Sequence, residues 1–319
     1  MRTRSDRLVA VATLGAFVVV AGVLGLVSIY LGAVTQALSG VQRSAPLPDY
    51  PGRPVLAAAE GSLPVRYLVL VNDPDAGLAS AYLAQLAGGR DSLHLIGLPA
   101  NLLVSDARGA ESTLADRARV SGADAVRSVE SLLGLRIDHL VTAELTGFAP
   151  VIDVIGGVDV DNHTEMSAEG WHFPAGELRL SSTNAEVYLS SSKQPMARLQ
   201  RTESVLVQVL RGITGGDSLT NPAKVETIGT VLRRCVTVDA GLTAGEIRRT
   251  ALDVHLGSDA ISGFPVPLAG VSELNGQPVT VADTAAVAEL RTAMQNDGLD
   301  DWAGRQADPW KPLATLPPR

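Results

Sequence analysis

The chain has 319 residues, a formal net charge of −8 at pH 7 and a single cysteine. An acidic chain whose basic residues cluster only at the N-terminus lacks the concentrated positive surface that nucleic-acid binding needs, so no nucleic-acid partner is expected. The lone Cys235 excludes an intrachain disulfide and a cysteine-based metal cage, and its expected role is that of a small buried hydrophobe.

The N-terminus has the features of a membrane anchor. Arg2, Arg4 and Arg7 precede an uncharged run over residues 8–34, which exceeds the roughly 20 residues that cross a bilayer as a helix. The arginines predict that residues 1–7 stay in the cytoplasm and that the rest of the chain lies outside a cell membrane that it spans once. A cleaved signal peptide is the alternative, but its apolar region would be about 7 to 15 residues long.

Proline-rich segments mark the predicted ends of the folded region. Residues 35–64 contain five prolines and little apolar periodicity, which is typical of a semi-rigid extracellular linker. Residues 65–297 are predicted to form one α/β domain, because strand and helix patterns interleave without a break in composition. Residues 298–319, again rich in proline, are predicted to be a disordered tail.

The first strand of this domain is predicted from Tyr67 to Val71, an apolar run typical of a strand buried on both faces of a sheet. It ends abruptly at Asn72 and Asp73. The pattern of residues 80–87 alone is compatible with a helix or with the first strand of a hairpin.

The clearest run of elements lies in the middle of the chain. Ser121 and Asp124 form a capping-box-like pair ahead of an amphipathic helix, and Gly134 supplies its C-cap. A strand over residues 137–145, a short helix closed by Gly156-Gly157 and a further strand follow.

Four helices are predicted beyond this region. A long one carries Arg198 and Arg201 at its start, three residues apart on one face. Two cations in the first turn oppose the helix dipole and therefore favour an anionic partner. Asn221, Thr243 and Asp283 are the predicted N-caps of the other three helices.

Two segments carry a family resemblance. The runs G-L-x-I-D-H, G-F and I-G-G-V-D-V fall within residues 134–160, and "HFPAGELRLSSTNAEVYL" occupies residues 172–189. Together they resemble the LytR-CpsA-Psr family of bacterial envelope proteins over roughly residues 65–213. The resemblance favours the hairpin over the helix near residue 80 and implies a mixed central sheet flanked by helices.

The family resemblance also implies a function. It implies a phosphotransferase that moves a glycopolymer from a polyprenyl pyrophosphate carrier to peptidoglycan. Such chemistry needs an apolar cavity for the prenyl chain, Mg²⁺ or Mn²⁺ held by carboxylates, and arginines that stabilise the transferring phosphoryl group. The implied partners are a polyprenyl-phosphate lipid, peptidoglycan or a cell-wall glycopolymer, and the membrane.

The sequence keeps only part of the family's charged positions. The resemblance assigns Asp73 to the metal, and Arg198 and Arg201 to catalysis and to the lipid phosphates, with Lys193 placed to compensate nearby. Other family arginines and aspartates are replaced in four segments: Val71–Asp75, Leu78–Ala81, Pro99–Asn101 and Tyr188–Ser192. Because one well-placed donor in such a site is worth roughly 3 kcal/mol, the sequence predicts weak or lost catalysis.

Other interpretations of these residues stay open. The fold is also compatible with a non-catalytic module that binds polyprenyl lipid or assists an active paralogue. Asp73, which follows a buried strand, is equally typical of a residue that forms a turn. The pair Arg198 and Arg201 is equally typical of the solvated face of a helix. His163, Glu165 and His172 match no standard metal motif.

A rebuilt anion site is a further possibility. It would be assembled from charged residues outside the family motifs, namely Asp75, Asp106, Arg108, Asp116, Arg117 and Arg119.

Overall fold

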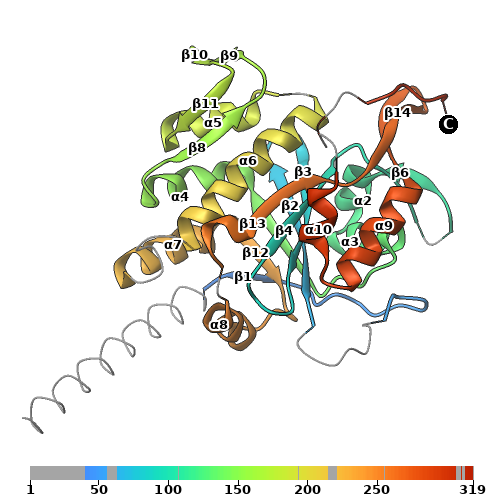
Figure 1. Ribbon diagram of the computed structural model, residues 1–319, viewed down its shortest axis with the longest axis horizontal. Coiled ribbons are helices and arrows are strands. Elements are labelled where there is room, and N and C mark those ends of the chain that lie inside the picture. Colours follow the sequence, from blue (N-terminus) through green and yellow to red (C-terminus); the bar gives the residue numbers. More distant parts are fainter. Residues whose placement is uncertain are drawn as a thin grey trace, which may run out of the picture.

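The computed structural model describes residues 40–55, 63–106, 108–192, 194–214, 221–254, 256–306, 310 and 313–318. Its centre is a seven-stranded mixed sheet in the order β1-β12-β7-β2-β3-β4-β13 (Figure 1). The strands are β1 (Gln42–Ser44), β12 (Val236–Asp239), β7 (His139–Glu144), β2 (Val65–Asp73), β3 (Gly77–Leu86), β4 (Leu93–Pro99) and β13 (Ile261–Pro265). The pairs β1–β12, β7–β2 and β4–β13 are parallel, and the other three are antiparallel.

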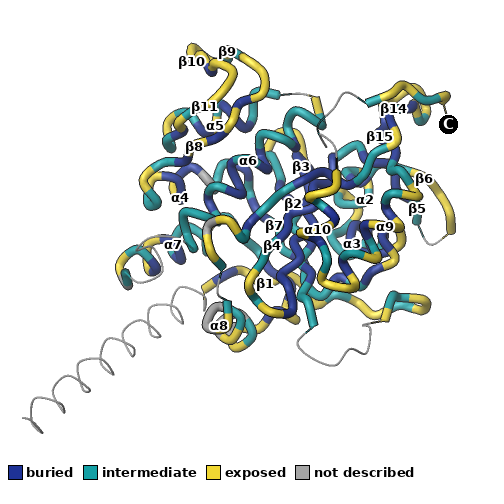
Figure 2. The backbone as a smooth tube through the Cα atoms, viewed as in Figure 1, coloured by how far each residue is buried: buried dark blue, intermediate teal, exposed yellow. Residues whose placement is uncertain are grey.

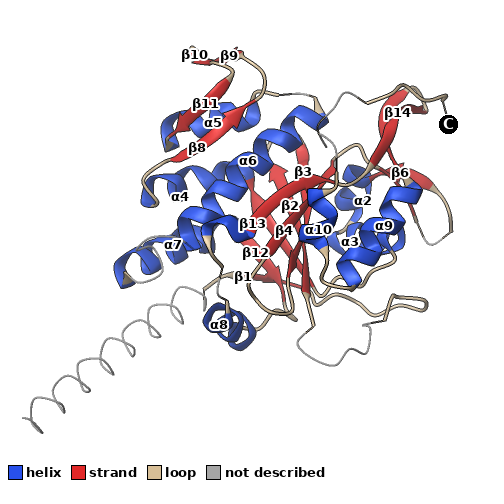
Figure 3. Cartoon of the chain, in the orientation of Figure 1, coloured by secondary structure: helices blue, strands red, loops and turns tan. Residues whose placement is uncertain are grey.

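Helices cover both faces of this sheet, as predicted (Figure 3). One face carries α2 (Leu114–Val120), α3 (Gly122–Leu133), α9 (Thr284–Gln295) and α10 (Leu299–Gly304). The other carries α4 (Phe148–Val154), α5 (Ser182–Ser190) and α6 (Pro195–Thr214). The helix α7 (Pro222–Cys235) leads directly into β12, and α8 (Ala244–Asp253) follows that strand.

The central strands are largely buried (Figure 2), and their two-residue period divides the core into two clusters, one on each face of the sheet. In β2, Leu68 and Leu70 pack into the cluster beneath α3 and α9, whereas Val71 packs into the cluster beneath α6. In β3, Leu83 and Tyr82 divide in the same way. A strand buried on both faces therefore appears as the continuous apolar run seen in the sequence.

Short two-stranded ribbons surround this core. They are β5 (Leu103–Ser105) with β6 (Glu111–Thr113), β8 (Val158–Asn162) with β11 (Gly176–Leu180), β9 (Met166–Ala168) with β10 (Trp171–Phe173), and β14 (Leu268–Leu274) with β15 (Gln277–Ala282). Two 3₁₀ turns, η1 (Leu145–Gly147) and η2 (Ser258–Ala260), complete the described elements.

Several local predictions are confirmed. Strands β3 and β4 form the hairpin, with Ser80 opposite Pro99 and Leu86 opposite Leu93. The hydroxyl of Ser121 accepts a hydrogen bond from Asp124 N at 3.0 Å at the start of α3, and Gly134 ends that helix with φ of 64°. The predicted N-caps of α7, α8 and α9 likewise accept hydrogen bonds from the first turns of their helices. One local expectation is corrected, because Cys235, expected to be a small buried hydrophobe, is only half-buried.

The structure corrects the predicted linker before residue 65. Strand β1 pairs in parallel with β12 and forms an edge of the central sheet. Farther on, Arg53 and Tyr50 contact the carboxylate of Glu130, which is fully buried in α3. The prolines predicted a semi-rigid linker. The residues that hold this segment in place, in β12 and α3, lie far away in the sequence, so the local pattern did not reveal them.

The predicted disordered tail also needs correction. Leu299 and Trp302, on one face of α10, are 1% and 4% exposed, and the Trp302 ring lies 5.3 Å from that of Phe264. Farther on, Leu316 N donates to Val271 O at 2.7 Å, so residues 313–318 extend the β14–β15 ribbon. Prolines in this segment leave enough backbone donors and acceptors for pairing.

The predicted transmembrane segment, residues 8–34, lies outside the described residues. Within the described ranges, no helix has both the length and the apolar character needed to cross a membrane.

Candidate functional site

The structure brings Asp73 and Arg198 together. Asp73 ends β2, and its Oδ2 lies 3.6 Å from Arg198 Nη1 on α6, with both side chains 12% exposed. Its Oδ1 accepts backbone hydrogen bonds from Asp75 and Ala76 at 3.0 and 3.3 Å. Asp73 is therefore a turn former and, at the same time, the residue that orients Arg198.

Both arginines contact the turn that follows α5. Arg198 Nε donates to Ser192 O at 2.8 Å, and Arg201 Nη1 donates to Ser191 Oγ at 3.4 Å. Ser190, the last residue of α5, and Ser192, in this turn, occupy the positions where the family resemblance expects two further arginines. The guanidinium groups of Arg198 and Arg201 thus contact the segment in which serines stand at the expected arginine positions. Lys193, the third predicted phosphate ligand, lies outside the described residues.

Arg201 lies over an aromatic ring. Its Cζ is 5.5 Å from the centre of the Tyr188 ring, a cation–π contact that fixes the guanidinium plane. Burial lowers the pKa of Arg201, an effect that Tyr188 opposes. Burial raises the pKa of Tyr188 to about 12, so Tyr188 is a neutral platform. Arg201 also lines a small hollow of about 20 Å³ with Asp161, His163 and Ser204.

Polar side chains continue from Arg198 into the core. Ser80, Tyr82 and Thr202 are at most 1% exposed, and Tyr82 donates to Leu199 O at 2.9 Å. The hydroxyls of Ser80 and Thr202 have no hydrogen-bond partner among the described residues. Ser80 lies in the segment where the family resemblance expects an arginine and an aspartate, and in this chain its hydroxyl is buried.

Glu203, which the sequence analysis did not single out, is a buried carboxyl group next to Thr202 in the chain. It is 5% exposed on α6 and faces Gly97 of β4 and Gly263 of β13. A Cβ at Gly97 would lie 2.9 Å from Glu203 Oε2, and one at Gly263 would lie 2.7 Å from its Cγ. The two glycines therefore make room for the carboxyl group. Burial raises the pKa of Glu203 well above its ordinary value, because the low-polarity surroundings favour the protonated carboxyl group.

Replacing Glu203 with glutamine is expected to change how the free energy of unfolding depends on pH. The folded state holds the proton more tightly than the unfolded chain, whose glutamates titrate near pH 4.3. The contribution of Glu203 is thus fully present below that pH and is lost as the pH rises toward the raised folded pKa. Denaturation between pH 4 and pH 8 should show wild-type stability falling relative to Glu203→Gln. The exposed control Glu186→Gln should run parallel to wild type, and parallel curves for Glu203→Gln would refute the buried, protonated state.

The donors around Asp73 do not form a metal site by themselves. Across the described residues, no three His, Cys, Asp or Glu side chains lie close enough together to hold a metal ion. His163 and His172 instead contact Asp161 O and Ser167 Oγ, each at 3.2 Å. Asp73 is one carboxylate with a guanidinium against it, which is not the oxygen cage that a resident Mg²⁺ needs.

The suggested rebuilt site does not form around Asp73. Asp106, Arg108 and Arg117 do converge, but on the α2–α3 side of the sheet, opposite α6. Asp116 and Arg119 pair with each other at 2.6 Å on the surface of α2. Of the six suggested residues, Asp75 is the one that stays beside Asp73, to whose Oδ1 its backbone N–H donates at 3.0 Å. The suggested arginines do not join Arg198 and Arg201.

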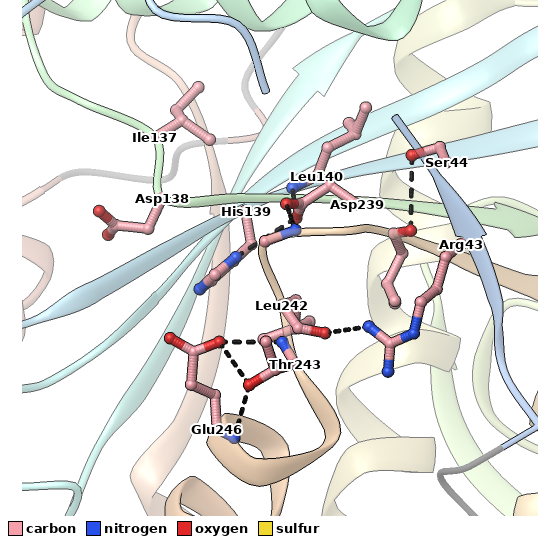
Figure 4. Close-up of polar contacts among 12 residues, drawn as sticks. Arg43, Ser44, Ile137, Asp138, His139, Leu140, Asp239, Leu242, Thr243 and Glu246 are labelled. Carbon is pink, nitrogen blue, oxygen red and sulfur yellow. Dashed lines mark hydrogen bonds and ion pairs between the residues drawn. The ribbon is translucent and has the colours of Figure 1, made fainter. Parts of the chain in front are cut away.

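A second polar cluster lies at the opposite end of β7 from this site (Figure 4). Asp239, 1% exposed, accepts from Leu140 N at 3.0 Å and Gly241 N at 2.8 Å, and lies 3.3 Å from His139 Nδ1. Close by, Arg43 of β1 donates to Leu242 O at 2.5 Å. These contacts fasten β1 and β12 to the sheet, so the cluster has a structural explanation.

Comparison with known proteins identifies the fold and the family. The model of the LytR_cpsA_psr family matches residues 80–296. Cell wall biosynthesis protein LcpA of Corynebacterium glutamicum is 26% identical over 211 residues, which are 62% of this chain and 41% of that protein. Polyisoprenyl-teichoic acid–peptidoglycan teichoic acid transferase TagU of Bacillus anthracis is 30% identical over 99 residues, which are 30% of this chain and 33% of that protein.

Among solved structures, B. subtilis TagV superposes with a TM-score of 0.63 at 18% identity, covering 75% of this chain and 98% of that chain. The chain spans less than half the length of the two curated relatives described above. The family match nevertheless extends over most of the described domain and includes α6 with both arginines. The chain therefore belongs to the LytR-CpsA-Psr family.

Proposed function

We propose that the protein acts in the bacterial cell envelope on a glycopolymer carried by a polyprenyl pyrophosphate, with peptidoglycan as the acceptor. The family membership and the similarity to TagU, a polyisoprenyl-teichoic acid–peptidoglycan teichoic acid transferase, support this assignment. The observation that carries it is the pair Arg198 and Arg201 at the start of α6, with Arg198 held by Asp73.

In this proposal each residue has a limited role. Arg198 and Arg201 bind the pyrophosphate and offset charge that develops during phosphoryl transfer. Asp73 is a positioning residue, because its contact is with Arg198. The hydrogen bond to Ser192 O and the stacking on Tyr188 reduce the side-chain freedom that binding would otherwise remove.

We further propose that catalysis is weak or lost. Arg198 already uses two of its nitrogens for Ser192 and Asp73, and serines occupy the neighbouring positions of two expected arginines. The second candidate function is therefore a module that binds the polyprenyl lipid or assists an active paralogue. The buried serine at position 80, in place of a charged motif, favours this candidate.

The cofactor and the cellular location of the protein are proposed from the sequence. Mg²⁺ or Mn²⁺ is the predicted cofactor, and the single carboxylate of Asp73 would need the substrate's own phosphates to complete such a site. The predicted location is outside the cell membrane, attached through residues 8–34 with the N-terminus in the cytoplasm.

Binding of a polyprenyl pyrophosphate to the full-length chain in mild detergent tests the proposed site. Each guanidinium makes charge-assisted hydrogen bonds worth about 1.5 to 3 kcal/mol, so the Arg198→Gln, Arg201→Gln double variant should bind at least about tenfold more weakly. The control is Arg179→Gln, an exposed arginine paired with Asp159 outside the site. Equal affinity of the double variant and wild type would refute the site.

A further inference from the structure

A cleft of about 160 Å³ lies between the loop that follows β5 and the helices α2 and α3. Its lining contains three arginines, two aspartates and one serine: Arg108, Arg117, Arg127, Asp106, Asp124 and Ser128. This cleft is separate from the proposed active site, because α2 and α3 cover the face of the sheet opposite α6.

The cleft is positively charged in a chain whose net charge is −8. Two of its arginines face aspartates, Arg117 at 3.7 Å from Asp106 and Arg127 at 3.6 Å from Asp124. Both distances exceed the 2.7 to 2.9 Å of a charge-assisted hydrogen bond. The buried Nε atoms of Arg117 and Arg127 have no hydrogen-bond partner among the described residues. Arg108, the third arginine of the lining, is exposed, so the cleft carries one more positive than negative charge.

The arginines are also held in place before any ligand arrives. Asp106 Oδ1 accepts from the backbone N–H groups of Arg108 and Ala110, both at 2.8 Å, which fixes the loop. Arg117 Nη2 donates to Ala110 O at 2.8 Å. Arg127 lies over the ring of Tyr50, with its Cζ 4.7 Å from the ring centre. The side chains of Arg117 and Arg127 therefore lose little entropy when an anion binds.

We propose that this cleft is a second phosphate-binding site, in which Arg108, Arg117 and Arg127 converge on one phosphate group. Guanidinium groups match the oxygens of phosphate with paired hydrogen bonds, and the excess of one positive charge suits a singly charged phosphodiester. The physiological ligand, which rests on the proposed function, is a phosphate group of the glycopolymer chain. The cleft thereby anchors the polymer on the face of the domain opposite the pyrophosphate.

Protection from phenylglyoxal, which modifies exposed arginines, tests this site residue by residue. The full-length chain is treated with and without inorganic phosphate at constant ionic strength, and modified arginines are mapped by mass spectrometry. The protection curve gives the dissociation constant of phosphate. At a phosphate concentration of about ten times this constant, modification of Arg108, Arg117 and Arg127 should be roughly tenfold slower. Arg119, on the same helix as Arg117 but outside the cleft, is the matched control and should react at an unchanged rate.

Two variants make the outcome decisive. Arg108→Gln replaces an exposed side chain and should remove the protection of Arg117 and Arg127 without loss of folding. The Arg198→Gln, Arg201→Gln double variant should keep full protection in the cleft, which separates this proposal from the function proposed for α6. Protection that extends to Arg119, that chloride reproduces, or that disappears in the double variant would overturn the second site.

Discussion

Replacing Arg53 with methionine is expected to lower the free energy of unfolding by about 3 to 5 kcal/mol, because it leaves a charged carboxylate buried without its partner. The Arg53 side chain is 5% exposed, and that of Glu130 is 0% exposed. Arg53 Nε lies 3.0 Å from Glu130 Oε1, and Tyr50 and the backbone of Ile137 donate to the same carboxylate at 2.6 and 2.9 Å.

Chemical denaturation at neutral pH measures this effect. The matched control is Arg119→Met, which breaks a surface pair with side chains 72% and 50% exposed and should change stability by less than about 1 kcal/mol. An Arg53→Met, Glu130→Met double variant should be more stable than Arg53→Met alone, because it removes the unpaired charge as well. Equal small effects of Arg53→Met and Arg119→Met would mean that residues 40–55 are a loosely attached spacer after all.

Local patterns were sufficient to predict most helices and the central strand. Ser121, Thr243 and Asp283 cap their helices as expected, because a cap depends on residues within one turn. The mixed sheet followed from the family resemblance together with the apolar run of β2.

Long-range pairing was not visible in the sequence. Strand β1 has three exposed residues, and its place in the sheet depends on β12, nearly 200 positions away. Trp302 near the C-terminus appeared to belong to a proline-rich tail, yet it packs against Phe264. In both cases the structure of the segment depends on its contact with a distant element, β12 for β1 and Phe264 for Trp302, and not on its own residues.

The candidate site was predicted in part. Asp73 and Arg198 were singled out from the sequence, and their contact at 3.6 Å is a finding of the structure. Glu203 was missed because a glutamate beside an arginine pair is typical of a solvated helix face. The signal that identifies Glu203 is the pair of glycines, Gly97 and Gly263, that make room for its carboxyl group. This pair can be recognised only once β4 and β13 are known to be neighbouring strands.

The largest functional effect is expected in glycopolymer transfer itself. Removing one donor that stabilises developing charge typically costs about 100-fold to 1,000-fold in rate. Wild-type protein, which has serines at positions 190 and 192, should therefore transfer slowly, and the Arg198→Gln, Arg201→Gln double variant should fall to background.

The most direct test is the rate at which the full-length chain, with Mg²⁺ or Mn²⁺ present, moves a glycopolymer from a polyprenyl pyrophosphate donor to peptidoglycan. The expected result is slow transfer at most, together with binding of the donor. The Arg198→Gln, Arg201→Gln double variant should bind the donor at least about tenfold more weakly and transfer it only at background rate. Rapid transfer by wild type that persists in the double variant would contradict the account, because the catalytic groups would then lie elsewhere.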